Sequence, residues 1–431
     1  MPPIEARLQR RYVMLVEAHQ HVASTVAAGL SHLPQTVTAF AATQAAWRFF
    51  NNDRVTLTAL AQPLHDAGRE ALRGDAQPCA LLVHDWSKID YAGHPSKPDL
   101  AQLTHENDIG YELATALLVS ASDGSPLAPM ELELTTADAV HSTRSRASRR
   151  GTSHVDQLLG RMRESVCWDL GKPVVHVIDR EADSVGHYRT WDAAGFHVLV
   201  RGNDRLVRWE GGEFLLSAVA DTLQARAAFG DAREVLYHGR PAWQLVAQTE
   251  VVLHRPARRR GRDGRQREVR GQPLTLRLVV ARLRTDSGEL LAQWLLLTNV
   301  PARWADAARV ALWYYWRWRI ESYHKLLKSH GQQVEHWQQE TGSAIARRLL
   351  VAAMACVVAW NLERAQTVPA AELREVLTRL SGRQMKTGRA TTTPALLAGL
   401  HVLLSMLDLL DHYDLDRLRQ LVRDVVPTRS G

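Results

Sequence analysis

The chain has 431 residues, which is long enough for two or three domains and at least one large hydrophobic core. Apolar residues make up 45% of it and charged residues 23%, as is usual for a folded globular protein. The formal net charge of +7 favours a polyanionic partner, of which nucleic acid is the commonest, but net charge alone does not decide the matter.

Cysteine usage and hydropathy exclude several classes of protein. Cys79, Cys167 and Cys356 are far apart and lack metal-ligand spacing, so we predict buried, reduced thiols and neither a zinc site nor a disulfide framework. The N-terminus has no apolar signal region, and the longest apolar run, residues 349–360, is too short to cross a bilayer. We therefore expect a cytoplasmic protein that does not enter a membrane.

Residues 1–75 are predicted to form a small basic helical domain. Apolar residues recur at helical spacing in three segments, and Arg7, Arg10 and Arg11 form a basic patch in the first of them. The predicted helices cover residues 4–30, 36–53 and 56–74.

Residues 76–204 change to short apolar strands that alternate with helices. The predicted order is β, β, β, α, β, α, β, which is the order of the ribonuclease H-like fold, a mixed sheet with helices on its faces. The segments in chain order are 79–87, a hairpin at 111–136, a helix at 155–170, a strand opening 172–183, a helix at 184–195 and a strand at 196–202.

The remainder of the chain is predicted to complete that core and to add two further parts. Residues 205–290 alternate apolar and polar side chains around an arginine-rich loop, which indicates a β-rich insertion. Residues 291–340 return to the core with a strand and a helix at 313–331, and residues 341–431 form a helical C-terminal region.

Two aspartates are placed where α/β sheets gather ligands. Asp85 and Asp179 each come at the carboxyl end of an apolar strand. A single charge there would most simply be leaving the sheet for solvent. Because the first and fourth strands are neighbours in the ribonuclease H-like order, the two carboxylates should converge, and like charges that close favour a divalent cation between them.

The predicted helix at 313–331, "WYYWRWRIESYHKLLKSHG", mixes aromatic rings, cations and one carboxylate. At 3.6 residues per turn, Tyr314, Arg317, Glu321 and Lys328 fall within a stripe roughly 60° wide. Such a face suits a wall that grips phosphates and stacks on bases. The alternative is an amphipathic helix with ordinary intrahelical ion pairs.

The spacing of these four residues resembles the YREK signature of the bacterial DDE transposases of the insertion-sequence-four family. Other segments are similar to the same family, and the resemblance extends from about residue 5 to residue 365. They are "HDWSKIDY" around Asp85, "VIDREADSVGHY" around Asp179, "FHVLVRG", "QWLLLTNVPARWADA" and "TQAAWRFFNND".

The resemblance implies a cut-and-paste DNA transposase. Asp85, Asp179 and Glu321 would be its catalytic triad and would hold two Mg²⁺ or Mn²⁺ ions. Double-stranded DNA, both transposon ends and target, would be the partner, with no nucleotide cofactor. The enzyme would act as a homodimer, with the N-terminal helices on the inverted repeats and a dimerising role for residues 341–431.

The resemblance also implies DNA contacts. Tyr314, Arg317 and Lys328 would hold a 5′ phosphate, and Trp294 would stack on a flipped base, unless it is an ordinary core residue. Further expected contacts are Arg201, Trp318 and the patch Arg7, Arg10 and Arg11.

Several features of the sequence allow more than one interpretation. The arginine-rich loops at 144–150 and 255–270 either contact the DNA backbone or are solvated loops. Asp90, Glu181 and Asp183 are regarded as bystanders to the triad, and His19, His141 and His154 lack zinc-like partners. Two rival functions are an inactive repressor that occupies transposon ends and a ribonuclease H-like nuclease without strand transfer.

Overall fold

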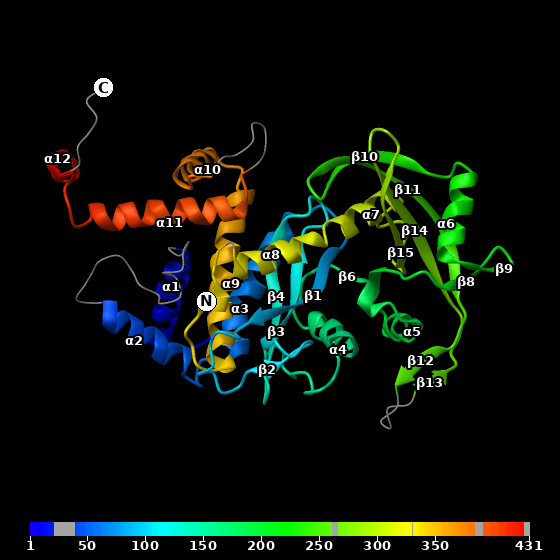
Figure 1. Cartoon of the computed structure of the whole chain (residues 1–431), viewed down its shortest axis with the longest axis horizontal. Helices are drawn as coiled ribbons and strands as arrows, with labels where there is room; N and C mark the ends of the chain where they lie inside the picture. Colours follow the sequence, from blue (N-terminus) through cyan, green and yellow to red (C-terminus); the bar gives the residue numbers. More distant parts are fainter. Residues whose placement is uncertain (21–38, 261–265, 330, 384–390, 426–431) are drawn as a thin grey trace.

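The computed structural model describes residues 1–20, 39–260, 266–329, 331–383 and 391–425. A mixed sheet runs through the centre of the molecule, with helices on both sides and a helical layer at one end (Figure 1). The part of the N-terminal prediction that covers residues 21–38 and the tip of the second arginine-rich loop lie outside the described residues.

One half of the sheet has the predicted ribonuclease H-like topology. Its strand order is β4-β3-β1-β6-β7, in which β3 is antiparallel to β1 and β4, and β6 is parallel to both β1 and β7. The fold class predicted from the sequence is therefore confirmed. These strands are β1 (Ala80–Asp90), β3 (Ile109–Val119), β4 (Pro126–Thr135), β6 (Val174–Ile178) and β7 (His197–Arg201), with short β2 (Ala101–Gln102) and β5 (Val140–Ser142) at the margin.

The sheet separates two hydrophobic cores. Along β7, Leu199 packs into one core and its neighbours Val198 and Val200 into the other, as the period of two requires. Because both faces are covered where β1 and β6 pair with each other, the paired residues 80–83 and 174–177 are apolar except for His176. The helices of the first core include α3 (Leu57–Arg73) and α9 (Gly342–Arg364), and those of the second are α4 (His154–Val166), α5 (Val185–Ala193) and α6 (Leu216–Ala225).

The β-rich insertion continues the same sheet and does not form a separate one. β15 pairs antiparallel with β7, and the order then runs β15-β14-β11-β8-β9, with β10 on β11, so that 13 strands are joined (Figure 1). Only β12 and β13 form a separate two-stranded ribbon within the described part. The bounds are β8 (Leu206–Trp209), β9 (Gly212–Leu215), β10 (Gly230–Tyr237), β11 (Arg240–Leu253), β12 (Ala257–Arg260), β13 (Gln266–Val269), β14 (Leu274–Arg284) and β15 (Leu290–Thr298).

The predicted helix at 313–331 is interrupted in the structure. It consists of α7 (Ala307–Tyr315) and α8 (Trp318–Lys328), joined by a turn at residues 316–317. The amide of Arg317 donates to the carbonyl of Tyr314 at 3.0 Å, and the amide of Ile320 donates to the carbonyl of Arg317 at 3.2 Å. These i→i+3 bonds tighten the chain, so a stripe drawn at 3.6 residues per turn does not hold across the junction.

Helix α9 is the central helix of the terminal helical layer. It is the one helix in the described chain that has the length and hydropathy to cross a membrane, but 83% of its most apolar window is buried inside the protein. It packs against α3, β4 and the N-terminal α1 (Ala6–Gln20), as a core helix does. The second N-terminal helix is α2 (Ala39–Phe50).

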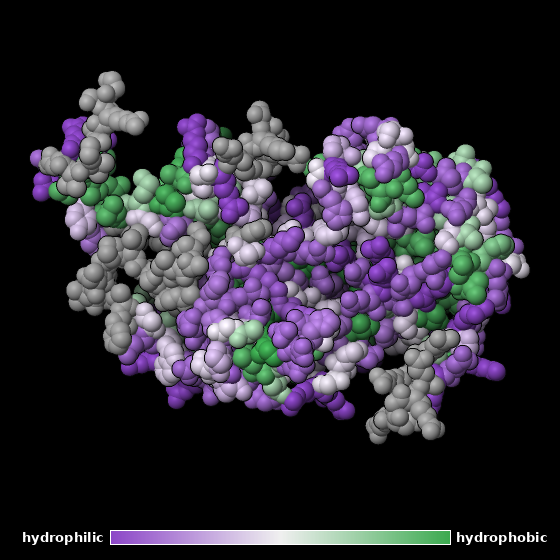
Figure 2. Space-filling view, in the orientation of Figure 1, coloured by the Kyte–Doolittle hydropathy of each residue, from purple (hydrophilic) through white to green (hydrophobic). Residues whose placement is uncertain are grey.

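The first two C-terminal helices pack beside α9 at one end of the molecule. α10 (Val368–Leu380) packs on α11 (Thr393–Leu410), and α11 extends away to α12 (Leu415–Val425) (Figure 1). Figure 2 shows hydrophilic residues over the middle of this face and hydrophobic residues where α11 and α12 lie. The prediction of three buried thiols was wrong for Cys167, which is exposed after the end of α4, whereas Cys79 and Cys356 are buried.

Candidate active site

The two aspartates lie at the same edge of the sheet. β6 pairs with β1 as far as Val83, so Asp85 lies two residues beyond the last parallel pair. Asp179 follows the last residue of β6 and begins a short 3-10 helix, η2 (Arg180–Ala182). Asp179 is thus at the carboxyl end of its strand, as predicted, whereas Asp85 lies in the middle of β1, which continues to Asp90 in pairing with β3. The two residues still meet, because Asp85 comes just after the part of β1 that pairs with β6.

The turn between α7 and α8 brings Tyr314, Arg317 and Glu321 to this edge of the sheet. Nη1 of Arg317 lies 3.4 Å from Oδ2 of Asp85, and its Nη2 donates to Oε1 of Glu321. Oη of Tyr314 donates to Oδ1 of Asp179 at 3.0 Å. Of the predicted triad, Asp85 and Glu321 therefore contact Arg317 directly. Asp179 instead accepts a hydrogen bond from Tyr314.

Burial sets the charges in this cluster. Burial raises the pKa of Asp85 to about 6, with Glu321 and Asp179 adding to the rise and Arg317 opposing it. Burial would raise the pKa of Asp179 as well, but Arg317, a backbone hydrogen bond, Tyr314 and Arg201 outweigh it and lower that pKa. The guanidinium of Arg317 is itself only 8% exposed, and although burial disfavours its charge, the surrounding acidic groups raise its pKa.

The donor set fits hard divalent cations, because it consists of carboxylate oxygens that carry more negative charge than one arginine balances. In their present arrangement, however, no group of three or more His, Cys, Asp or Glu side chains among the described residues is placed to hold a metal ion. Arg317 lies between Asp85 and Glu321, where such an ion would have to bind. The predicted pair of Mg²⁺ or Mn²⁺ ions therefore stays a prediction.

Lys328 and Arg201 lie near the cluster. Nζ of Lys328 donates to the backbone carbonyl of Lys88 on β1 and is 3.5 Å from Oε1 of Glu335. Arg201 ends β7 and lies close enough to lower the pKa of Asp179 by its charge. The structure thus brings both predicted cations to the edge of the sheet that carries Asp85 and Asp179.

The two predicted stacking residues differ in exposure. Trp294 on β15 is only 3% exposed and packs edge-to-face on Tyr314, with ring centroids 5.5 Å apart. This burial disagrees with a stacking role and agrees with the core alternative. Trp318 is 39% exposed at the start of α8 and borders a pocket of about 300 Å³. The other lining residues of that pocket are Leu236, Tyr237, His238, Tyr315, Trp316, Arg319 and Ser322.

Sequence reasoning missed a ring pair beside Asp85. Trp86 stacks on His154, with centroids 3.9 Å apart, and His154 lies 3.5 Å from a carboxylate oxygen of Glu112 and 3.3 Å from one of Glu181. Burial opposes the charge of His154, but these two carboxylates outweigh it and raise its pKa. A tryptophan directly after Asp85 was the available signal, but its partner comes from α4 and could not be read from sequence.

The bystander Asp183 has a structural role. Its buried carboxylate accepts from Tyr188 at 2.9 Å and from the backbone amide of Asn203 at 2.7 Å, and it pairs with Arg205. These bonds fix the segment that carries Asp179.

The first arginine-rich loop is partly anchored in the core. Arg144 and Arg161 form a buried cluster with Glu131 and Glu133, all with side chains at most 6% exposed. Neither interpretation of the loop, DNA contact or solvation, therefore applies to Arg144. Arg146, Arg149 and Arg150 are exposed.

The N-terminal patch is remote from the acidic cluster. Arg7 and Arg10 are exposed on α1 and Arg11 is half-buried, and α1 packs on α9 at the opposite end of the molecule from the β-rich insertion (Figure 1).

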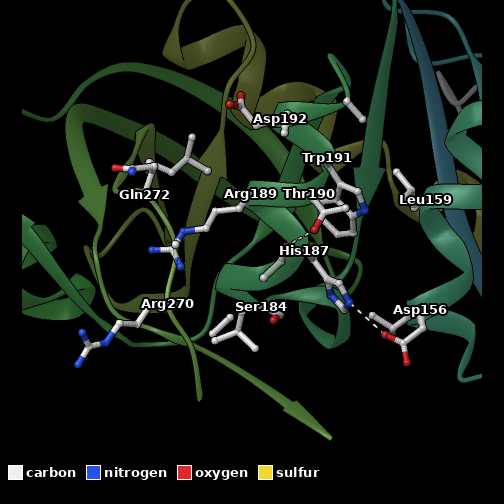
Figure 3. A pocket seen from close by; sticks show the side chains of 18 of the residues that line it. Asp156, Leu159, Ser184, His187, Arg189, Thr190, Trp191, Asp192, Arg270 and Gln272 are labelled. Carbon is white, nitrogen blue, oxygen red and sulfur yellow. Dashed lines mark hydrogen bonds and ion pairs between the residues drawn. The ribbon is translucent and has the colours of Figure 1, made fainter. Parts of the chain in front are cut away.

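A cleft of about 1320 Å³ opens between α4, α5 and the β12–β13 ribbon. Figure 3 shows Arg189 and Arg270 on one side of it and His187 paired with Asp156 on another. The residues that line it in the described structure include none of those predicted for the active site.

Comparison with known proteins defines the class. The family model described as "Transposase DDE domain" matches residues 132–358, more than half of the chain. The chain therefore belongs to the family of DDE-domain transposases. The match includes Asp179 and the segment from Tyr314 to Lys328, whereas Asp85 lies before it.

A solved structure, the cryo-EM structure of a piggyBac transposase synaptic complex with hairpin DNA, is similar at 8% identity and a TM-score of 0.32. The alignment covers 81% of this chain and 58% of that chain, so this protein matches little more than half of its length. At that TM-score the likeness does not support any detail.

Proposed function

We propose that this protein is a cut-and-paste DNA transposase that acts in the cytoplasm. It binds the inverted repeats at transposon ends, cleaves double-stranded DNA by phosphoryl transfer and joins the ends to target DNA. The observation that carries the proposal is the convergence of Asp85, Asp179 and Glu321 on the Tyr314–Arg317 turn, in a chain of the DDE-domain family.

The three carboxylates supply what such a reaction needs. Two Mg²⁺ or Mn²⁺ ions bound there would activate the attacking oxygen and stabilise the leaving oxygen of an in-line displacement. Asp85 and Asp179 are fixed by neighbouring strands, and Glu321 by the first turn of α8, which packs on β1. Rigid elements hold the three ligands more precisely than loops would.

The cations at the same edge suit the DNA backbone. Arg317 presents a planar fork that matches phosphate oxygens. Lys328 adds an ammonium group nearby, and Arg201 adds a second guanidinium. We assign to Tyr314, Arg317 and Lys328 the binding of a 5′ phosphate at the cut end.

A base extruded from the DNA would meet Trp318. Its ring is exposed beside the pocket formed with His238 and Tyr237, and an aromatic surface recovers part of the few kcal/mol that extrusion costs. We propose on this basis that cleavage proceeds through a DNA hairpin, with Trp318 in the stacking role first considered for Trp294.

The helical ends supply the remaining functions. Exposed Arg7 and Arg10, with Arg11 beside them, would contact the inverted repeat, and the apolar residues on α11 and α12 would join two copies in the complex with DNA.

The proposal is tested by cleavage of a labelled duplex that contains a transposon end, with Mg²⁺ or Mn²⁺. Asp85→Ala, Asp179→Ala and Glu321→Ala should each lower cleavage by several orders of magnitude and leave DNA binding in place. Asp90→Ala removes an exposed carboxylate from the same strand and should cleave normally.

The products distinguish the rival functions. Covalently closed ends followed by strand joining support the transposase. Cleavage without closed ends would indicate a nuclease without strand transfer, and binding without cleavage by the unsubstituted protein would indicate an end-binding repressor. Cleavage that survives all three substitutions would overturn the assignment of the triad.

A further inference from the structure

The contacts that Arg317 makes in the structure compete with its proposed task. Its terminal nitrogens contact Oδ2 of Asp85 and Oε1 of Glu321, whereas the proposed function requires the same fork for a DNA phosphate. Nε of Arg317 is buried and has no hydrogen-bond partner among the described residues. The Nη1 and Nη2 donors that contact the carboxylates are also those that would hold a phosphate in a paired contact, so the two interactions compete.

Arg317 also takes the place of a cation. A divalent ion bound between Asp85 and Glu321 would lie close to the guanidinium, and the repulsion between the two positive centres would oppose its binding.

Two other cationic side chains near Arg317 contact other groups and do not bridge the two carboxylates. Lys328 contacts the carbonyl of Lys88 and lies 3.5 Å from Glu335, and Arg319, two residues after Arg317, donates to the carbonyl of Gly124 at 2.8 Å. Asp179 is held separately by Tyr314. Arg317 is thus the cation that bridges the two carboxylates, and its removal would leave them uncompensated in a largely buried site.

We propose that Arg317 couples the binding of a phosphorylated DNA end to the loading of divalent cations. In the free protein it bridges Asp85 and Glu321 and so weakens cation binding. When a terminal phosphate takes the guanidinium, the two carboxylates lose their counter-ion and bind cations more tightly. The coupling rests on the proposed function, and by linkage it is reciprocal, so bound cations also strengthen the hold on the phosphorylated end.

The first test uses Mn²⁺ and the free protein, with binding followed by electron paramagnetic resonance. Arg317→Ala should bind Mn²⁺ about tenfold or more tighter than the unsubstituted protein, within the range of about 5- to 150-fold that is typical of coupled sites. Arg317→Lys keeps the charge but cannot bridge both carboxylates, so it should also bind more tightly. Lys325→Ala removes an exposed charge from α8 and should bind as the unsubstituted protein does.

The second test adds a blunt DNA duplex with either a terminal 5′ phosphate or a terminal 5′ hydroxyl. The phosphorylated duplex should raise the Mn²⁺ affinity of the unsubstituted protein more than the hydroxyl duplex does. With Arg317→Lys or Arg317→Ala the two duplexes should give equal affinities. If Arg317→Ala does not fold, the Lys variant and the duplex comparison still decide.

Failure of the coupling can be told from failure of the proposed function. If neither substitution of Arg317 changes the affinity of the free protein for Mn²⁺, the coupling is wrong, even where strand cleavage is observed. If the substitutions act as expected but the unsubstituted protein cleaves no DNA, the bridge stands and the transposase assignment falls. Equal effects of both duplexes on the unsubstituted protein would also overturn the coupling.

Discussion

Asp85 and Asp179 lie in one site, but their surroundings act on their charge in opposite directions. Burial raises the pKa of Asp85 to about 6, while Arg317, Tyr314 and Arg201 overcome the same effect at Asp179 and lower its pKa. This difference in pKa could not be predicted from the sequence, because it depends on which side chains of the α7–α8 turn each carboxylate contacts: Tyr314 for Asp179 and Arg317 for Asp85. The sequence did predict that the two residues meet, since each follows an apolar run, although Asp85 lies within β1 and does not end it.

Without metal, these two carboxylates should respond oppositely to substitution by Asn. The ionised form of Asp85 is disfavoured on folding, so its ionisation lowers stability as the pH rises from about 4 to about 6, by up to about 3 kcal/mol. Asp85→Asn should therefore stabilise the protein at pH 7. Asp179 contributes stability above its unfolded pKa that is lost as the pH falls, so Asp179→Asn should destabilise at pH 7.

Urea denaturation at pH 4.5 and pH 7 with a metal chelator present would measure both effects. Near pH 4.5 the stabilisation by Asp85→Asn should shrink, because the unsubstituted Asp85 is then largely protonated. A loss of stability from Asp85→Asn at pH 7 as large as that from Asp179→Asn would contradict the assigned electrostatics.

At the scale of elements, the sequence predicted most strands and helices of the core but missed the break between α7 and α8. The strand order was accessible because short apolar runs, most of them followed by polar or charged residues, mark the core strands. The interruption between α7 and α8 was not, since periodicity does not reveal i→i+3 bonds around Arg317. The burial of Trp294 and the pairing of β15 with β7 depend on contacts between distant segments, which no local pattern encodes.

Gly124 packs closely against the turn between α7 and α8. This residue has a φ of +74°, and a Cβ there would lie 2.4 Å from the ring of Trp316, within the turn that positions Arg317. Gly124→Ala should therefore combine backbone strain with a clash, cost about 1–3 kcal/mol beyond the strain alone, and reduce cleavage by displacing the turn.

Gly288→Ala is the matched control for Gly124→Ala. Gly288 has a φ of +85°, but a Cβ there would meet nothing within 4 Å, so only the strain of about 1 kcal/mol should appear. Thermal unfolding and strand cleavage, measured side by side, test the pair. Equal losses of stability and of cleavage from both substitutions would show that Trp316 can move aside without cost. The contact between Gly124 and Trp316 would then not be what positions the turn.

At the scale of the whole molecule, apolar side chains are exposed mainly away from the active site. Met406, Leu407 and Leu410 on α11 and Leu421 and Val422 on α12 are each 38–52% exposed. Soluble proteins seldom expose a cluster of this kind unless it meets a partner. We propose these side chains as the surface that joins two copies, although no pattern in the sequence identified them.

The double substitution Leu407→Glu with Leu410→Glu should weaken self-association on DNA, since charged side chains would have to be desolvated in the interface. Analytical ultracentrifugation with a transposon-end duplex would measure the ratio of protein to DNA. Gln420→Glu on α12 adds a charge to an exposed polar position and should leave that ratio unchanged. An unchanged ratio for the double variant would place the contact between copies elsewhere.

The pairing of β15 with β7 has a kinetic consequence. Every strand of the insertion lies between these two in the chain, so their contact closes a long loop, whereas β14 and β15 are adjacent and meet through a short turn. We expect the hairpins of the insertion to form early and to dock on the core late. Glu321, which follows β15, would then join the aspartates at the end of folding. Pulsed hydrogen exchange should show β14 protected before β7.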